Sequence, residues 1–546
     1  MKISRFLCLS VLAFSGCVMA VENAALVVAT PPPIVLEALP AVEFRVSPKG
    51  DDANDGSAAK PVRTLARAVE LTRELESDAP KTIIMADGAY PFTHAVEIGR
   101  DDYGLTIKAE HPGQAILTGA ADVTGWRKDE KDPRFLVAPM PFDAAQEMLY
   151  LFMNGDEVCE FSSYPEFFGS KTLPYQADES KGEHHRLVYK EKALPKGFDF
   201  SDLDTASAWL ILPQEWATTR TYILTNDVAN HAFDLKTKSD MPLGRFNQGY
   251  KIMNTRLGLR KPGMWMFEAT AKRIIYWPKP GETAENLKCR ITGAPCILDV
   301  RDVSSLALDG LVIEGCRTLF SNGIWSKNPL SAAVSVKCSR NVTVDTCEIR
   351  NTAGAGIMFL KADTCKVLNS HVHHCGTSAV DFVDGGEGNV EVSYCHLHDT
   401  GLLSTSGCIL HLQINDVKAI GNHIHDCPAN GIVMWARNAL VASNHIHHVM
   451  SVSRDGGGLY GAYNYSMIKD NHVHDTGGWP CLYADEGAMH TVFTGNRCEH
   501  WWPTHMHCTR YIAVTNNVFT CPGKGLRFSF QGSGAGIFSD NTLYLG

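Results

Sequence analysis

Several patterns that would assign this 546-residue chain to a common protein class are missing from its sequence. After the first twenty residues no run reaches the ~18 consecutive apolar residues of a membrane-spanning helix, so no transmembrane segment is predicted. No two cysteines have CxxC spacing, which argues against a structural zinc site. Basic residues do not exceed acidic ones (50 against 60), so the chain lacks the positive face of a nucleic-acid-binding protein.

The residues that are present have the composition of a globular protein, 45% hydrophobic and 20% charged. This balance excludes a disordered chain, a collagen and a coiled coil. The histidines are unevenly distributed, because 17 of the 22 lie between His371 and His507. Any account of the fold has to explain that clustering.

The N-terminus has the pattern of an export signal. Within residues 1–20, two basic residues precede the apolar run Phe6–Phe14, and small residues follow it. Residues 14–17 also resemble a bacterial lipoprotein box, with Cys17 as the lipidated residue. We therefore expect a secreted or periplasmic protein, or an outer-membrane lipoprotein anchored through Cys17. Residues 21–43, which contain three consecutive prolines, are interpreted as a linker.

Export would permit disulfides, but the cysteine count does not favour them. Without Cys8 and Cys17, 15 cysteines remain, an odd number. We expect most of them to be buried free thiols that serve as small core residues.

Two segments precede the regular part of the chain. Residues 44–125 combine short strands with a helix over 64–76, whose apolar residues recur at helical spacing, and are expected to form an N-terminal cap and the first turns of the fold. Residues 126–290 are rich in aromatic strand candidates without a helical period, and are expected to form an inserted, sandwich-like β domain.

From about residue 291 the sequence repeats itself every 20–27 residues. An apolar residue marks each copy, and in later copies an asparagine stands two positions earlier. The apolar markers are Ile349, Val372, Leu397, Ile424, Ile446, Val473, Cys498, Val518 and Leu543, and the asparagines are Asn422, Asn444, Asn471, Asn496, Asn516 and Asn541.

A unit this short cannot bury its own apolar face, so the copies must stack. The pattern predicts an all-β fold, a right-handed parallel β-helix of about ten turns over 291–546, with an asparagine ladder at one turn. The sequence ends at Gly546, within a copy. Because the end of a solenoid needs a polar cap, we expect the C-terminal end to be incomplete.

Most of the clustered histidines flank the apolar marker. One set precedes it by one residue and another follows it by one, so both sets point outward in two columns. The columns are His371, His396, His423, His445 and His472, and His373, His398, His425, His447 and His474. Because no carboxylate accompanies them and the repeat spacing exceeds a contact between ligands, a structural ladder is favoured over a metal site. No metal and no cofactor is predicted.

The second strand of each copy has a more varied outward face. Carboxylates, imidazoles, guanidinium groups and aromatic rings alternate there with inward apolar residues, as in a carbohydrate-binding groove. The predicted substrate-binding residues are Asp381, His411, Trp435, Arg437, Tyr460, Tyr483, His507 and Arg527.

Glycoside hydrolysis requires two carboxyl groups about 5–9.5 Å apart. Asp381 and Asp485 are four copies apart, ~19 Å at the spacing of β-strands, and cannot form that pair. Asp455 lies one copy before Asp485, which makes Asp455 and Asp485 the predicted catalytic pair. Glu486 is the alternative partner and Glu499 a weaker one. The Gly456–Gly458 run after Asp455 fits a tight turn or a close approach to a sugar equally well.

These motifs resemble those of bacterial β-helix enzymes that act on polysaccharides. The resemblance covers about 44 to 546 and is closest to glycoside hydrolase family 141, whose activities include α-L-fucosidase and xylanase; a β-xylosidase family of the same architecture is the next neighbour. It implies two acidic catalytic residues on the β-helix face. It rests on Phe44–Asp51, Lys60–Leu65, Leu151–Gly155, Ser163–Glu166, Gly263–Phe267, Ile275–Pro278, Asp455–Tyr460 and Leu482–Gly487.

The leading hypothesis is a monomeric, exported glycoside hydrolase that cleaves a plant or algal polysaccharide, with xylan- or fucose-containing glycans as substrates. A polysaccharide lyase acting on a uronate-containing glycan is the first alternative, with Arg437, Arg510, Lys524 or Arg527 as the proton-abstracting base. A non-catalytic carbohydrate-binding β-helix protein is the second.

Overall fold

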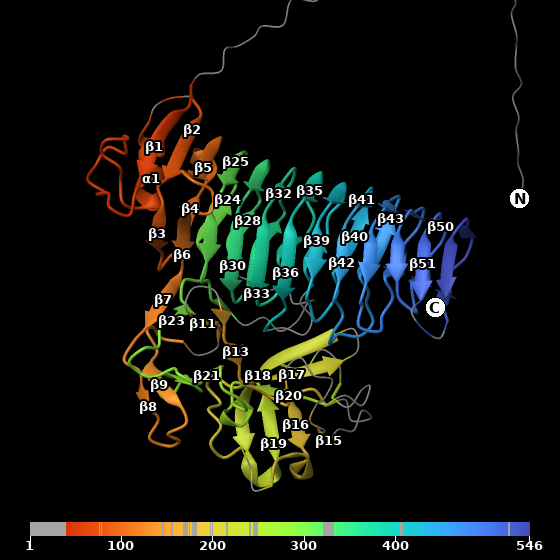
Figure 1. The fold of residues 1–546 in the computed structure, drawn as a ribbon, viewed down its shortest axis with the longest axis horizontal. Coiled ribbons are helices and arrows are strands. Elements are labelled where there is room, and N and C mark those ends of the chain that lie inside the picture. The colour runs from red at the N-terminus through yellow and green to blue at the C-terminus, as the bar shows by residue number, and fades with distance from the viewer. Residues whose placement is uncertain are drawn as a thin grey trace, which may run out of the picture. The chain divides into compact units, whose positions relative to one another are not determined.

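Short parallel strands stacked in three sheets form the main body of the protein (Figure 1). The computed structural model describes residues 40–545 apart from short gaps, the longest of which are 167–172, 177–182, 244–248 and 320–331. Among the described residues these sheets contain 13, 11 and 12 strands, and each complete coil contributes one strand to each sheet. The predicted parallel β-helix is confirmed. Residues 291–546, as far as the structure describes them, supply ten strands to each sheet. The prediction of about ten turns is too low for the whole β-helix, because strands before residue 291 extend every sheet.

Two of the sheets are named by the side chains on their outer faces, and the remaining one is called the third sheet. The carboxylate sheet consists of β4 (Val96–Ile98), β24 (Leu298–Arg301), β28 (Ala332–Lys337), β31 (Ala355–Leu360), β34 (Val380–Val383), β37 (Leu410–Leu412), β40 (Ile432–Arg437), β43 (Leu459–Asn464), β46 (Leu482–Ala484), β49 (Thr504–His507) and β52 (Phe528–Gln531). The histidine sheet consists of β3 (Gly88–Pro91), β6 (Ala115–Thr118), β26 (Val312–Glu314), β30 (Glu348–Thr352), β33 (His371–Cys375), β36 (His396–Thr400), β39 (His423–His425), β42 (His445–His447), β45 (His472–His474), β48 (Arg497–Glu499), β51 (Val518–Cys521) and β54 (Thr542–Leu545). The third sheet consists of β1 (Val42–Val46), β2 (Lys81–Met85), β5 (Leu105–Ala109), β25 (Leu306–Asp309), β29 (Val342–Asp345), β32 (Lys366–Leu368), β35 (Val390–Ser393), β38 (Val417–Ile420), β41 (Leu440–Ala442), β44 (Met467–Lys469), β47 (Val492–Thr494), β50 (Ala513–Thr515) and β53 (Ile537–Ser539).

An asparagine ladder closes the turn between the third sheet and the histidine sheet. Each side chain accepts hydrogen bonds from the backbone N–H and the Nδ2 of the asparagine one coil earlier, at 2.9–3.1 Å. The ladder runs through Asn422, Asn444, Asn471, Asn496, Asn517 and Asn541. Asn517 and Phe519 therefore replace the predicted Asn516 and Val518, because the coil after Cys498 is one residue longer than the alignment assumed.

The first coil is covered by the only α-helix among the described residues, α1 (Leu65–Glu74). Thr64 caps it by accepting a hydrogen bond from the backbone N–H of Arg67 at 3.2 Å. Leu65, Ala68, Val69 and Thr72 are buried on one face, as the helical spacing predicted. Among the described residues, no helix is long and apolar enough to cross a membrane. The predicted signal 1–20 lies outside the described residues, as does most of the linker, whose end at 42–43 belongs to β1.

The predicted β-rich insertion is present and slightly wider than 126–290. It begins with β7 (Ala120–Val123) and ends with β23 (Cys289–Thr292), which pair antiparallel. Between them the described residues form strands of four sheets, one of which contains the hairpin β17 (Trp209–Gln214) and β18 (Ala217–Asp227), seen in Figure 1 below the β-helix. Ala353 and Leu403, from turns of the β-helix, belong to the apolar core of the insertion, so the insertion packs against the coils.

The cysteines conform to the prediction of free thiols. All those from Cys159 to Cys521 are free, and most are buried. Burial raises the pKa of Cys347, Cys365 and Cys395 to about 12, so these thiols stay protonated and act as small apolar residues.

The histidine columns lie on the outer face of the histidine sheet, with rings stacked at 4.8–5.1 Å along each column. Burial and the neighbouring imidazoles lower the pKa of His371 to about 3 and that of His445 to about 4, so both rings are neutral at pH 7. The two sequence arguments against a metal site are wrong. Side chains reach diagonally between coils, and carboxylates such as Asp399 and Asp426 do contact the columns.

Candidate active site

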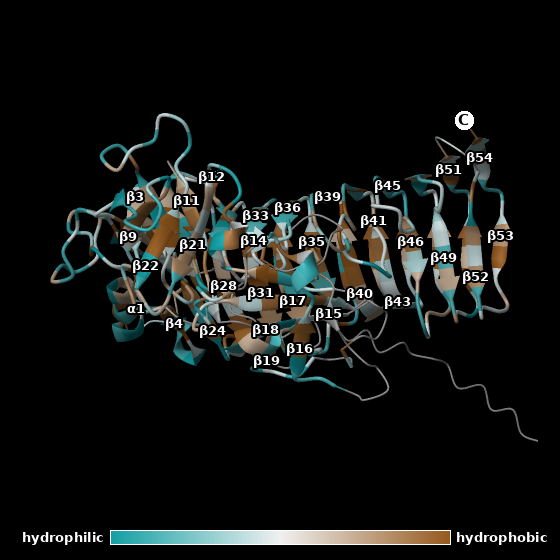
Figure 2. Ribbon diagram, turned by 90° about the horizontal axis from the view of Figure 1, so that it is seen from below, coloured by the Kyte–Doolittle hydropathy of each residue, from teal (hydrophilic) through white to brown (hydrophobic). Residues whose placement is uncertain are grey.

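Four neighbouring strands of the carboxylate sheet present the candidate site. Figure 2, viewed from below, shows β40, β43, β46 and β49 side by side. Leu459 and Leu482 point into the core, so the residues that follow them, Tyr460 and Tyr483, point outward on paired positions. Their rings meet edge to face with centroids 4.9 Å apart. The strand period therefore sets two tyrosines side by side on adjacent coils.

Asp485 directly follows β46 and is held by two neighbours. The Tyr460 hydroxyl donates to its Oδ2 at 2.7 Å, and Nδ1 of His507 lies 2.9 Å from its Oδ1. The Asp485 side chain keeps 20% of its surface exposed, so a ligand can reach it. A carboxylate whose two oxygens contact different neighbours is fixed in orientation.

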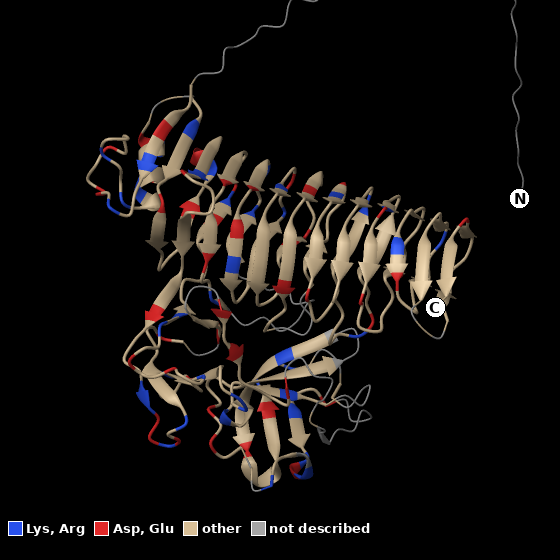
Figure 3. Ribbon diagram, in the orientation of Figure 1, with Lys and Arg blue, Asp and Glu red and all other residues tan. Residues whose placement is uncertain are grey.

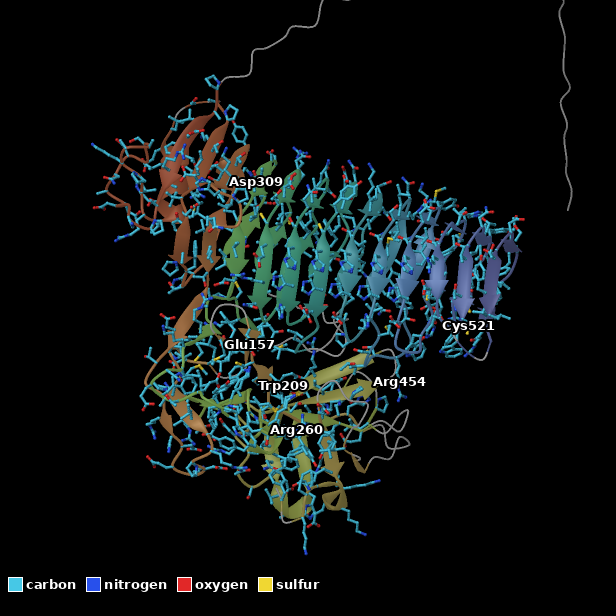
Figure 4. The ribbon with its side chains drawn as sticks, viewed as in Figure 1. Glu157, Trp209, Arg260, Asp309, Arg454 and Cys521 are labelled. Carbon is cyan, nitrogen blue, oxygen red and sulfur yellow. The ribbon has the colours of Figure 1, made fainter. Side chains whose placement is uncertain are left out.

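Asp455 lies in the turn before β43 and is partly buried. The Tyr483 hydroxyl donates to its Oδ1 at 3.1 Å. Figure 4 labels the residue before it, Arg454, at the lower edge of the β-helix. The two carboxylates are thus joined through the paired rings, in the order Asp455, Tyr483, Tyr460, Asp485.

The glycine run after Asp455 is required by packing between coils. A Cβ at Gly456 would come within 2.2 Å of Oδ1 of Asn430, and one at Gly458 within 2.5 Å of a Val473 methyl carbon. All three glycines are buried. Of the two interpretations of this run, the structure supports the packed turn, which presses the loop that carries Asp455 between its neighbouring coils.

The tyrosine hydroxyls remain hydrogen-bond donors over the whole working range of pH. Burial, followed by the charge of Asp485, raises the pKa of Tyr460 well above its ordinary value. Burial and the charges of Asp455 and Asp485 do the same for Tyr483. Because both hydroxyls keep their protons, they orient the carboxylates rather than exchange protons with them.

The predicted outward row is wrong in its last two coils. Thr504 pairs with the inward Leu482, so His505 lies beside Tyr483 and His507 falls beside Asp485. The polar Thr504 is fully buried, and an alignment of apolar residues passes over it. Arg527 likewise precedes β52, where its guanidinium lies 3.9 Å from the ring centre of Trp502.

His505 is the neighbour that the sequence reasoning missed. It is 7% exposed, and its ring centre lies 4.4 Å from that of Tyr483 and 5.2 Å from that of Trp502. If Thr504 had been recognised as the inward residue, His505 would have been placed in the outward row, because the side chain after an inward residue points outward.

The remaining predicted residues extend the row or lie apart from it. Trp435 contacts the rings of Tyr460 and His411 edge to face, with centroids 5.8 and 6.3 Å away. Asp381 is 1% exposed, with its Oδ1 3.6 Å from Nδ1 of His411. Arg437 is exposed at the end of β40, where its guanidinium lies over Tyr465.

Glu486 and Glu499 do not join the two aspartates. Glu486 is exposed next to Asp485. Glu499 belongs to the histidine sheet, where it contacts Nε2 of His472 at 2.8 Å. Within the described part of the chain, the groups of His, Cys, Asp and Glu able to share a metal ion all lie on that sheet, not at this site.

Comparison with known proteins identifies the fold. The family model for the right-handed β-helix region matches residues 287–417, and comparison with curated protein sequences gives no match. A solved structure named "Glycoside hydrolase" has a TM-score of 0.70 at 17% identity, covering 92% of this chain and 96% of that chain. XylC in complex with xylose has a TM-score of 0.51 at 11% identity, covering 92% and 86%. A GH136 lacto-N-biosidase from Eubacterium ramulus has a TM-score of 0.40 at 11% identity, covering 92% and 68%.

Proposed function

We propose that the chain is an exported bacterial glycoside hydrolase that works as a monomer and cleaves a polysaccharide with Asp455 and Asp485. One observation carries the proposal: two aspartates from adjacent coils, Asp455 in the turn before β43 and Asp485 directly after β46, are each oriented by a tyrosine hydroxyl of the carboxylate sheet. Secretion, or anchoring through Cys17, follows from the N-terminal pattern.

The contacts favour different roles for the two carboxyl groups. Asp485 is held in a fixed orientation by Tyr460 and His507 on its two oxygens, and we assign it the role of nucleophile or base. Asp455 is then the acid that protonates the leaving oxygen of the sugar. The rings of Trp435 and Tyr460 offer surfaces on which a sugar can stack beside the scissile bond.

The substrate class rests on the resemblance and on the structural neighbours. Two structural neighbours with TM-scores of at least 0.5 are a structure named "Glycoside hydrolase" and XylC in complex with xylose. Together with the resemblance to family 141, they favour xylan- or fucose-containing glycans.

A panel of polysaccharides tests the reaction class. The protein is incubated with xylan, fucosylated glycans and pectin, while reducing ends and the absorbance of unsaturated uronate are followed. New reducing ends without unsaturated product support the hydrolase. Unsaturated product would instead establish a lyase, and release of intact sugar from a saturable complex would establish a binding protein.

Asp455→Asn should show a loss of activity that depends on the leaving group. On a natural oligosaccharide we expect kcat/KM to fall ~10²–10⁴-fold, the usual contribution of a general acid. On an aryl glycoside with an acidic phenol as leaving group, which needs no protonation, we expect less than about a tenfold loss.

The matched control is Asp470→Asn, since Asp470 is an exposed aspartate in a turn with the same left-handed backbone conformation. It should leave both rates unchanged. If Asp455→Asn lowered kcat/KM equally on the two substrates, Asp455 would not be the general acid.

A further inference from the structure

The two histidine columns are joined by diagonal contacts between successive coils. Nε2 of the first four first-column rings faces Nε2 of the second-column ring one coil later, at 2.7–2.9 Å. The facing pairs are His371 with His398, His396 with His425, His423 with His447, and His445 with His474. Each pair thus brings two imidazole nitrogens to one point on the surface of the sheet.

The rings of the second column are oriented by the residue that follows each histidine in the chain. The residue after each of its histidines has a left-handed backbone, which turns its side chain back toward Nδ1 of that histidine. Asp399, Asp426 and Asp475 contact Nδ1 of His398, His425 and His474 in this way, at 2.6–2.7 Å.

A carboxylate at Nδ1 fixes the tautomer of the ring. The Nδ1 proton is donated to the aspartate, so the lone pair of Nε2 points outward toward the facing histidine. Carboxylate–histidine pairs of this kind support metal-ligating histidines in other proteins.

Carboxylates end the array on both sides. In the coil before the first pair, Glu348 takes the first-column position and contacts Nε2 of His373 at 3.2 Å. In the coil after the last pair, Glu499 takes the second-column position opposite His472. Figure 3 shows charged residues on β30 and β48, whereas the strands between them are almost entirely uncharged along their length.

We propose that this array binds divalent transition-metal ions, a role separate from the proposed hydrolysis and in place of the purely structural one expected from the sequence. Four trios of histidines have nitrogens within 4.8 Å of one another. They are His371, His373 and His398; His396, His423 and His425; His423, His445 and His447; and His445, His472 and His474.

The spacing favours Cu²⁺ or Ni²⁺ over Zn²⁺. Nitrogens bound at about 2.0–2.1 Å are roughly 2.9 Å apart when the ligand angle is 90° and about 3.4 Å apart in a tetrahedron. The facing pairs match the first value, which belongs to tetragonal sites. Binding moves the proton of the first-column ring from Nε2 to Nδ1, so no proton needs to leave.

Neighbouring sites cannot all be filled. The last three trios share His423 or His445 with a neighbouring trio, and successive trios are one coil apart, where two dications repel each other strongly. We therefore expect one to three ions per chain, with successively weaker affinities.

Titration of the full chain with CuCl₂, against glycine as a weak competitor, tests the proposal. The variant His371→Gln/His423→Gln/His445→Gln removes one member of every trio with three substitutions. Its control, His94→Gln/His111→Gln/His490→Gln, removes three exposed histidines outside the array. Circular dichroism and thermal melting establish that both variants are folded.

We expect saturable binding by the wild type and the control, and at least a hundredfold weaker binding by the array variant. Because the array variant could fail to fold, the wild-type Cu²⁺ complex is also examined by electron paramagnetic resonance, where two or three imidazole nitrogens should split the signal. Equal binding by both variants, or a spectrum without nitrogen splitting, would overturn the proposal.

Discussion

Replacing Asp485 by Asn is expected to lower kcat/KM at least ~10³-fold, on a natural oligosaccharide and on an activated aryl glycoside alike. An amide cannot attack the sugar or remove a proton from water, whatever the leaving group. The substitution keeps the shape of the side chain, so one of the two neighbours, Tyr460 or His507, stays within reach of its oxygen and the other faces its amide nitrogen. Initial rates on both substrates, with melting curves to verify the fold, measure the effect.

Glu486→Gln is the matched control for that experiment. Glu486 is the next residue in the chain, carries the same charge and is exposed. Its replacement should change kcat/KM less than about twofold, because loss of one exposed charge only alters the weak surface field. If Glu486→Gln abolished activity while Asp485→Asn retained it, Glu486 would be the catalytic partner and the assignment of Asp485 would be wrong.

Asn471→Ala is expected to lower the free energy of unfolding by about 3–5 kcal/mol. The side chain is 1% exposed, accepts from Asn444, and donates to the Val441 carbonyl and to Asn496. Its removal leaves several buried polar groups unpaired, each of which costs about 1–3 kcal/mol. Urea unfolding followed by circular dichroism measures the change.

Asn516→Gly tests whether Asn516 belongs to the asparagine ladder or is an ordinary turn residue. Asn516 is exposed and has a left-handed backbone, which glycine adopts without strain. It was predicted to belong to the ladder, whereas the structure puts Asn517 there. Asn516→Gly should therefore change the unfolding free energy by less than about 1 kcal/mol. A loss as large as that of Asn471→Ala would restore the predicted register.

The coils could be predicted from sequence because their core alternates regularly. Ile424, Ile446 and Val473 recur next to histidines, and this fixes which side chains face outward through most of the stack. The same alternation brought Tyr460 and Tyr483 together, and with them the two aspartates.

Prediction failed where a coil changes length or buries a polar residue. The inward Thr504 moved His505 and His507 along the row, and the longer coil after Cys498 moved Asn516 out of the ladder. An alignment error of one residue assigns every following side chain of that strand to the wrong face. The diagonal contacts of the histidines could not be predicted either, because they depend on how side chains lean across a coil.

The regular step between coils turns the outer face of the carboxylate sheet into a molecular ruler. From Asp381 on β34 to Asp485 beyond β46 there are four steps, ~19 Å at the ~4.8 Å spacing of strands. A glycan with one bond at Asp485 reaches the Asp381–His411 pair only if it extends over several sugar units in that direction. Inserting one whole coil between β37 and β40 (Ile432–Arg437) would lengthen this reach by one step of ~4.8 Å and leave the contacts of Asp485 with Tyr460 and His507 in place.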